Sequence, residues 1–129
     1  MTESDLENIC IAWFQELEYD YKAGPDIAPR GATPERKNFA QVILHERLRE
    51  ALDRINPGLP ESATVDAFER TSRFSSGSLV DGNREMYHWI RDGVPVEIEA
   101  DGGKRGALVQ VVDWTNQAND WLVVNQLAV

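Results

Sequence analysis

Apolar residues recur at helical spacing near the start of the chain. Over residues 5–18 they recur at positions i, i+3, i+4, i+7 and i+11, which forms one stripe of an amphipathic helix; they are Leu6, Ile9, Cys10, Trp13 and Leu17. The residues Ser4-Asp5-Leu6-Glu7 fit a capping box, in which the Ser4 hydroxyl and the Glu7 carboxylate each satisfy a free backbone N–H. The pattern therefore predicts a first helix over about residues 5–18.

A loop and then a longer helix are predicted next. Proline and glycine are too frequent for a helix or an interior strand at Gly24, Pro25, Pro29, Gly31 and Pro34. Thr33-Pro34 supplies an N-cap and a first-turn proline, and the apolar residues from Phe39 to Ile55 keep a helical period until Asn56-Pro57-Gly58. This apolar stripe is expected to be core, on the longest helix of the chain.

Two shorter helices are predicted in the middle of the chain. One covers residues 62–73, and the other covers residues 79–91 and is closed by Gly93. Gly82 disfavours the first turn of the second of these helices, because glycine costs about 1 kcal/mol in a helix interior.

From Val94 the pattern changes from a helical period to alternation. Residues 94–99 alternate apolar and polar, residues 101–104 make a tight turn, and residues 107–114 are rich in valine, which together predict a hairpin. After a polar turn, residues 121–127 are apolar on both faces and predict a third strand, central in its sheet. The order of elements predicts an α+β fold, with N-terminal helices followed by an antiparallel β-meander, in a single domain or partial domain over residues 1–129.

Composition agrees with a globular protein, since 42% of residues are hydrophobic and 27% are charged. The apolar runs are far shorter than the roughly 20 residues that cross a bilayer. Residues 1–8 carry three acids and no base, unlike a signal or transit peptide. We therefore expect a cytoplasmic protein without membrane contact. The lone cysteine, Cys10, is expected to be buried and inert.

The charge is strongly acidic. Thirteen Lys and Arg against 22 Asp and Glu give a net charge of −9. Such a field repels a phosphate backbone, which counts against a self-sufficient DNA-binding module. It counts less against a piece of a larger enzyme whose basic channel lies on other domains.

Several segments, taken in order, resemble the R (restriction) subunit of type I restriction-modification enzymes. Residues 79–96 look like that family's Asn-Arg/Lys-Glu helix followed by a Leu/Ile-Arg-x-Gly-Val strand start. Residues 111–121 and 123–126 resemble its Val-Asp-Trp-x-Asn, Asn-Asp-Trp and Val-x-Asn-Gln segments. Earlier parts of the chain that also fit are Arg36, residues 44–52 and residues 56–60. No single piece is specific, but the ordered series spans nearly the whole chain.

The resemblance implies a much larger parent protein. In that family the R subunit begins with a nuclease domain of the PD-(D/E)xK type, which uses Mg²⁺. ATP-driven, helicase-like motor domains follow, and then a helical region that docks on the modification (M) and specificity (S) subunits. This chain corresponds to the front part of the nuclease domain, and the family's catalytic Asp and Glu-x-Lys strands come after the position of Val129. We therefore expect the parent to be a type I site-specific deoxyribonuclease that acts on foreign DNA. The chain alone is expected to be inactive and to hold neither Mg²⁺ nor ATP.

Glu7 is the one residue for which the resemblance favours a place near the catalytic centre. Many nucleases of this class carry an acid on the first helix that faces the metal site, so Glu7 is a candidate accessory acid. The capping box explains Glu7 equally well, and both interpretations stay open.

Asp26 and the Glu35-Arg36-Lys37 segment match the letters of a PD…ExK motif but not its chemistry. Two acids must converge on Mg²⁺ beside a lysine, and this fold achieves that on adjacent strands. Here we expect Asp26 in a solvated loop and Glu35 in the first turn of the long helix.

The other polar candidates favour structural roles. Asp113 is expected to form a turn, and no second ligand stands at metal-binding spacing from His45 or His88. Glu97 and Glu99 flank the hairpin and are weak candidates for a metal contact. A group of bases interleaves with acids, which predicts a salt-bridged surface of the long helix; these bases are Arg36, Lys37, Arg47, Arg49 and Arg54.

Two other functions stay open. The first is a stand-alone acidic protein-interaction module without catalytic activity, and the second, ranked last, is a nuclease that uses Asp26, Glu35 and Lys37. A downstream strand with Pro-Asp, followed by a strand ending in Glu-x-Lys, would favour the restriction subunit over both.

Overall fold

A computed structural model of the protein describes residues 1–73 and 77–129. The chain forms two compact units. The first unit contains residues 1–44 and 120–129, and the second contains residues 45–119. The second unit is therefore inserted in the sequence of the first.

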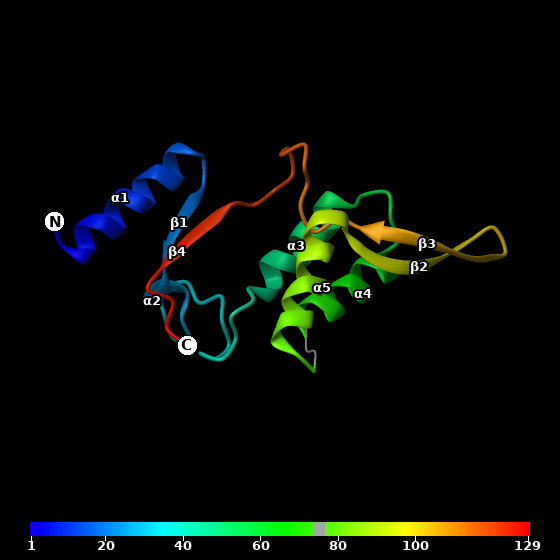
Figure 1. Ribbon diagram of the computed structural model, residues 1–129, viewed down its shortest axis with the longest axis horizontal. Coiled ribbons are helices and arrows are strands. Elements are labelled where there is room, and N and C mark those ends of the chain that lie inside the picture. Colours follow the sequence, from blue (N-terminus) through cyan, green and yellow to red (C-terminus); the bar gives the residue numbers. More distant parts are fainter. Residues whose placement is uncertain (74–76) are drawn as a thin grey trace. The chain divides into compact units, whose positions relative to one another are not determined.

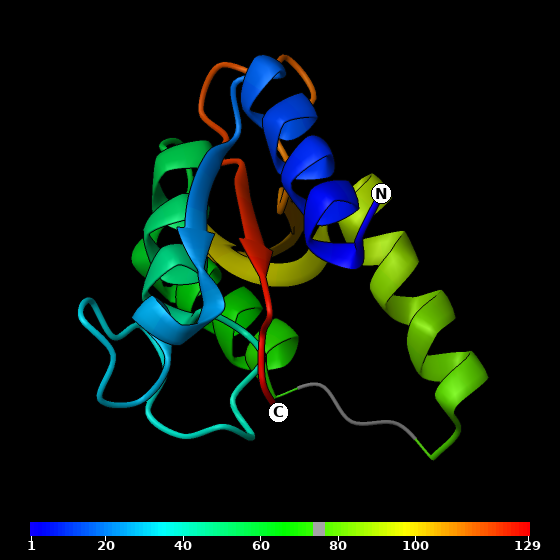
Figure 2. The same cartoon turned by 90° about the vertical axis from the view of Figure 1, so that its left-hand side faces the viewer.

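The first unit is built on a two-stranded parallel sheet. Helix α1 (Glu3–Glu16) leads into strand β1 (Asp20–Ala23) and the four-residue helix α2 (Gly24–Ile27), and strand β4 (Leu122–Asn125) returns beside β1. The pairing runs from Asp20 with Leu122 to Ala23 with Asn125. In Figure 2 the blue β1 and the red β4 lie side by side, with α1 next to them.

Helix α1 begins two residues earlier than the sequence pattern predicts. Its N-cap is Thr2, whose hydroxyl accepts a hydrogen bond from the Asp5 N–H at 3.1 Å. The Asp5 carboxylate accepts in return from the Thr2 N–H at 2.8 Å and completes the capping box. The prediction that Ser4 and Glu7 form this box was wrong, because Thr2 and Asp5 have the same spacing and lie two residues earlier. Glu7 is thus free of any capping role.

The apolar stripe predicted for α1 is only partly buried. Cys10 is half-buried, whereas Trp13 and Leu17 are 60% and 69% exposed. The buried residue of the helix is Ile11, which lies outside the predicted stripe.

The long helix predicted from Pro34 is wrong in its first half. Helix α3 covers only His45–Ile55. The Arg36 guanidinium donates hydrogen bonds to the carbonyls of Phe39 and Gln41, each at 2.7 Å. These carbonyls therefore bind a side chain and not the backbone N–H groups of a helix. These local contacts of Arg36 therefore override the helical period between Phe39 and Leu44.

Three helices and a hairpin form the second unit. Helices α4 (Glu61–Ser72) and α5 (Leu79–Asp92) lie close to their predicted positions, and Gly93 ends α5 with a φ of 98°. The Ser78 hydroxyl caps the start of α5, so Gly82 does not delay this helix. The arrangement is shown in Figure 1. The core consists of Leu52, Ala63, Ala67, Trp89, Val94, Val96, Ile98 and Val109.

The hairpin is present as predicted, although its second strand lies at Gly103–Val109 and not at residues 107–114, whereas the predicted meander is wrong. Strands β2 (Val94–Ala100) and β3 (Gly103–Val109) are antiparallel, and Asp101 and Gly102 make the turn with φ of 46° and 82°. Strand β4 pairs with β1 and not with β3, so it is not the central strand of a three-stranded sheet. The mixture of helices and small sheets agrees with the predicted α+β class. No helix in the described residues has the length and hydropathy needed to cross a membrane.

Candidate functional site

Glu7 lies at one end of the parallel sheet of the first unit. It is half-buried on α1, and its Oε2 atom accepts a hydrogen bond from Nε2 of Gln126 at 3.3 Å. Gln126 directly follows β4, and its φ of 49° turns the chain sharply there. Because β1 and β4 are parallel, their carboxyl ends lie at the same edge of the sheet. We call Glu7, Tyr21, Asn125 and Gln126 the strand-end site.

Two further contacts hold the strand-end site together. The Tyr21 hydroxyl on β1 donates to Oδ1 of Asn125 on β4 at 2.9 Å. Gly24 follows β1 directly, and a Cβ atom there would lie 2.3 Å from the Gln126 carbonyl oxygen and 2.5 Å from that of Asn125. Only glycine lets the two backbones approach so closely.

The chemistry of the strand-end site rests on one carboxylate. Gln126 donates a hydrogen bond to Oε2 of Glu7. Within the described part of the chain, no group donates to Oε1 of Glu7. Glu7 can therefore accept one more hydrogen bond, from water or from a substrate group. No group of three His, Cys, Asp or Glu side chains in residues 1–73 and 77–129 could hold a metal ion. One carboxylate beside an amide does not fit a Mg²⁺ site by itself.

The PD…ExK look-alike residues lie near one another but form no such site. Asp26 is exposed on α2, and the Glu35 N–H donates to the Ile27 carbonyl at 2.9 Å, which brings the loop back beside that helix. The backbone N–H of Lys37 donates a hydrogen bond to Oε1 of Gln41. Glu35 does not stand in the first turn of a helix, so that prediction was wrong.

The predicted salt-bridged stripe of bases on the long helix is wrong for two of its five members. Arg36 and Lys37 precede α3, and Arg36 is only 3% exposed. On α3 itself, Arg54 donates to the Ala118 carbonyl at 2.7 Å, and Arg49 lies over the Phe68 ring at 5.8 Å. These bases bind backbone and aromatic groups because tertiary neighbours are within their reach.

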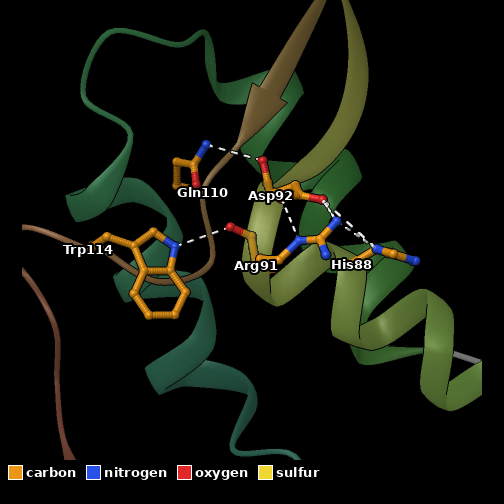
Figure 3. Close-up of polar contacts among 5 residues, drawn as sticks. All are labelled: His88, Arg91, Asp92, Gln110 and Trp114. Atoms are coloured by element: carbon orange, nitrogen blue, oxygen red, sulfur yellow. Dashed lines mark hydrogen bonds and ion pairs between the residues drawn. The ribbon is translucent and has the colours of Figure 1, made fainter.

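In the second unit, polar side chains gather at the end of α5 (Figure 3). Arg91 donates two hydrogen bonds to the Asp92 carboxylate, from Nε to Oδ1 at 2.8 Å and from Nη2 to Oδ2 at 2.6 Å. These bonds lower the pKa of Asp92. Nη2 also lies 3.1 Å from Nδ1 of His88. The Trp114 indole N–H donates to the Arg91 carbonyl at 3.2 Å, and Nε2 of Gln110 donates to the Asp92 carbonyl at 3.4 Å. The cluster therefore caps the carboxyl end of the helix.

Asp113 forms a turn, as predicted. Its carboxylate accepts from the Thr115 hydroxyl at 2.6 Å and from the backbone N–H groups of Thr115, Gln117 and Ala118 at 2.9 to 3.0 Å. These bonds, with that of the Thr115 hydroxyl the strongest, lower the pKa of Asp113 to about 2.

We expect the turn at Asp113 to loosen only in strong acid. The folded pKa lies below the ordinary value of 3.8, so the stabilisation is complete above pH 3.8 and is lost as the pH falls through about 2. The amide NMR shifts of Gln117 and Ala118 should titrate together near that lower pH. In Asp113→Asn this titration should vanish, and a midpoint near 4 in the unchanged protein would contradict the assignment.

The similarity of this chain to known proteins extends over its whole length. A family model described as the type I restriction enzyme R protein N terminus matches residues 1–129. The chain is 32% identical over 130 residues to the type I restriction enzyme HindI endonuclease subunit of Haemophilus influenzae, covering 100% of this chain. It is 28% identical over 125 residues to a Methanocaldococcus jannaschii protein named provisionally as the type I restriction enzyme MjaIXP endonuclease subunit, covering 96% of this chain. The matched part spans only 12% of each relative's length. No solved structure matches the chain.

Proposed function

We propose that this chain, which belongs to the type I restriction enzyme R protein N-terminal family, forms the front part of the DNA-cleaving domain of an R subunit. The observation that carries this proposal is the family match over all 129 residues, together with 32% identity to a type I endonuclease subunit.

The finer parts of the proposal concern the parent protein. We assign the domain to the PD-(D/E)xK nuclease class, and the parent to an ATP-driven complex that binds DNA together with M and S subunits. The residues of the strand-end site do not hold Mg²⁺ by themselves; bound in the parent domain, the ion would supply the charge that activates water and stabilises the leaving phosphate oxygen. The chain alone is proposed to be inactive, since the strand-end site offers one carboxylate. A cytoplasmic location stays a prediction of the sequence.

Glu7 is proposed as an accessory acid of the cleavage centre. The end of a parallel sheet is a place where side chains from two strands and a neighbouring helix converge, and Glu7 meets Gln126 there. Gln126 fixes one carboxylate oxygen, so the other is held in a defined direction to accept a hydrogen bond from the attacking water.

We expect Glu7→Gln in the intact R subunit, assembled with its M and S partners, to slow DNA cleavage by about 100-fold or more, which is typical for loss of a group that activates water. ATP hydrolysis should stay near normal, because the proposed motor is separate. Linearisation of plasmid DNA and phosphate release measure the two activities.

Glu3→Gln is the matched control for this experiment, since Glu3 is an exposed acid on the same helix. It should leave both activities unchanged. Equal cleavage by Glu7→Gln and the unchanged protein would remove Glu7 from the cleavage centre.

A stand-alone protein-interaction module is the alternative function. Its net charge of −9 and the exposed Trp13 and Leu17 on α1 are the observations in its favour. An open reading frame that ends shortly after Val129 would favour this alternative, whereas a longer frame with a DNA-cleaving product would exclude it.

A further inference from the structure

Arg36 is a buried cation without a role in the function described above. It is 3% exposed, and burial of a guanidinium is costly unless its N–H groups are hydrogen-bonded. Nε donates to the Gln41 carbonyl at 2.7 Å, Nη2 to the Phe39 carbonyl at 2.7 Å, and Nη1 to the Ala128 carbonyl at 2.8 Å. The guanidinium also lies over the Phe39 ring, 5.7 Å from its centroid.

These acceptors belong to two segments that are far apart in sequence. The carbonyls of Phe39 and Gln41 lie in the loop that Arg36 itself begins, whereas Ala128 lies beyond β4 and is 92 residues away. Arg36 therefore ties the 36–41 loop to the segment that leaves the parallel sheet.

The tied segment is the one that carries the Glu7 contact. Gln126 binds Glu7 through its side chain, and two residues later Arg36 binds the Ala128 carbonyl. On the other side, Gly24 lies directly against the Gln126 and Asn125 carbonyls. Residues 125–128 thus contact both Gly24, at the start of α2, and Arg36 of the 36–41 loop.

We infer that Arg36 is a positioning residue: by fixing the backbone after β4 it orients Gln126 and, through Gln126, the carboxylate of Glu7. The inference rests on the proposed role of Glu7 in DNA cleavage. Arg36 acts through backbone carbonyls and touches no reacting atom.

The geometry requires an arginine and not merely a positive charge. Each of the three guanidinium nitrogens serves a different carbonyl, and the planar fork sets the angle between these bonds. A lysine ammonium is a single point charge and cannot reproduce this fork. Arg36→Lys therefore keeps the charge and removes the geometry.

The test compares Arg36→Lys with Glu7→Gln and with the double variant, all in the intact R subunit assembled with its M and S partners. We expect Arg36→Lys to lower the cleavage rate by about 10- to 100-fold, as small misplacements of a reacting group do, and to leave ATP hydrolysis unchanged. In the Glu7→Gln background the same substitution should cause no further loss, because both act on one carboxylate. Lys37→Arg, at the neighbouring exposed base, is the control and should cleave normally.

Hydrogen exchange read by mass spectrometry separates positioning from folding. In Arg36→Lys, exchange should rise in residues 36–41 and 125–129 and stay unchanged in α1. Cleavage losses that multiply in the double variant, an Arg36→Lys variant that cleaves normally, or lost protection throughout α1 would each overturn the inference. If Glu7→Gln alone cleaves normally, the role of Glu7 fails, and the exchange pattern then decides separately whether Arg36 fixes the segment after β4.

Discussion

Leu52→Ala is expected to lower the free energy of unfolding of the second unit by about 2 to 5 kcal/mol, the usual range for a buried leucine cut back to alanine. Leu52 on α3 is 1% exposed and belongs to the core formed by α4, α5 and the hairpin. Leu48, one turn earlier, packs against the same core but is only partly buried, so its truncation should cost less. Urea unfolding followed by the fluorescence of the buried Trp89 measures the loss.

Leu79→Ala provides the matched comparison, because the same atoms are removed from a leucine that is 82% exposed on α5. Its effect should stay within about 0.5 kcal/mol. A similar loss for both variants would mean that the core of the second unit is not formed as described.

Gly24→Ala is expected to destabilise the first unit by about 1 to 3 kcal/mol or more, the range for overpacking a close contact. The added Cβ would meet the Gln126 carbonyl oxygen at 2.3 Å, and neither partner can swing aside because both are backbone. The Glu7–Gln126 hydrogen bond should be lost as the chain after β4 moves away. Amide hydrogen exchange in β1 and β4 measures the loss, because the fluorescence of the four tryptophans would mix signals from both units.

Gly58→Ala is the control for the effect of an added methyl group. No atom of the described residues lies within 4 Å of the position that its Cβ would take, so the stability of the protein should change by no more than about 0.5 kcal/mol. If Gly24→Ala were equally harmless, residues 125 and 126 would have to lie farther from the start of α2.

The sequence pattern predicts the second unit far better than the first. Helices α4 and α5 and the hairpin are contiguous, and their period, caps and turn residues can be read locally. Strand β1 alternates polar and apolar residues, Asp20-Tyr21-Lys22-Ala23, but four residues are too few for this alternation to predict a strand. Its partner β4 lies about 100 residues away, and nothing in a local pattern indicates that pairing.

The residues of the candidate site were likewise predicted only in part. Glu7 was selected through the family resemblance, whereas spacing alone assigned it to a cap that Thr2 and Asp5 form instead. Gln126 lies in a segment that matches the family, yet no local rule pairs it with a residue 119 positions earlier. The burial of Arg36 was missed because its carbonyl partners depend on how the loop folds back.

The insertion of the second unit between β1 and β4 has a kinetic consequence. Residues 45–119 contain all of their own core, so this unit can fold as soon as it has been synthesised. The sheet of the first unit must wait for β4, and closing a loop of about 100 residues carries a large entropic cost unless that loop is already compact. Early folding of the inserted unit would shorten the effective loop. We therefore expect pulse-labelled amides of β2 and β3 to gain protection during refolding before those of β1 and β4.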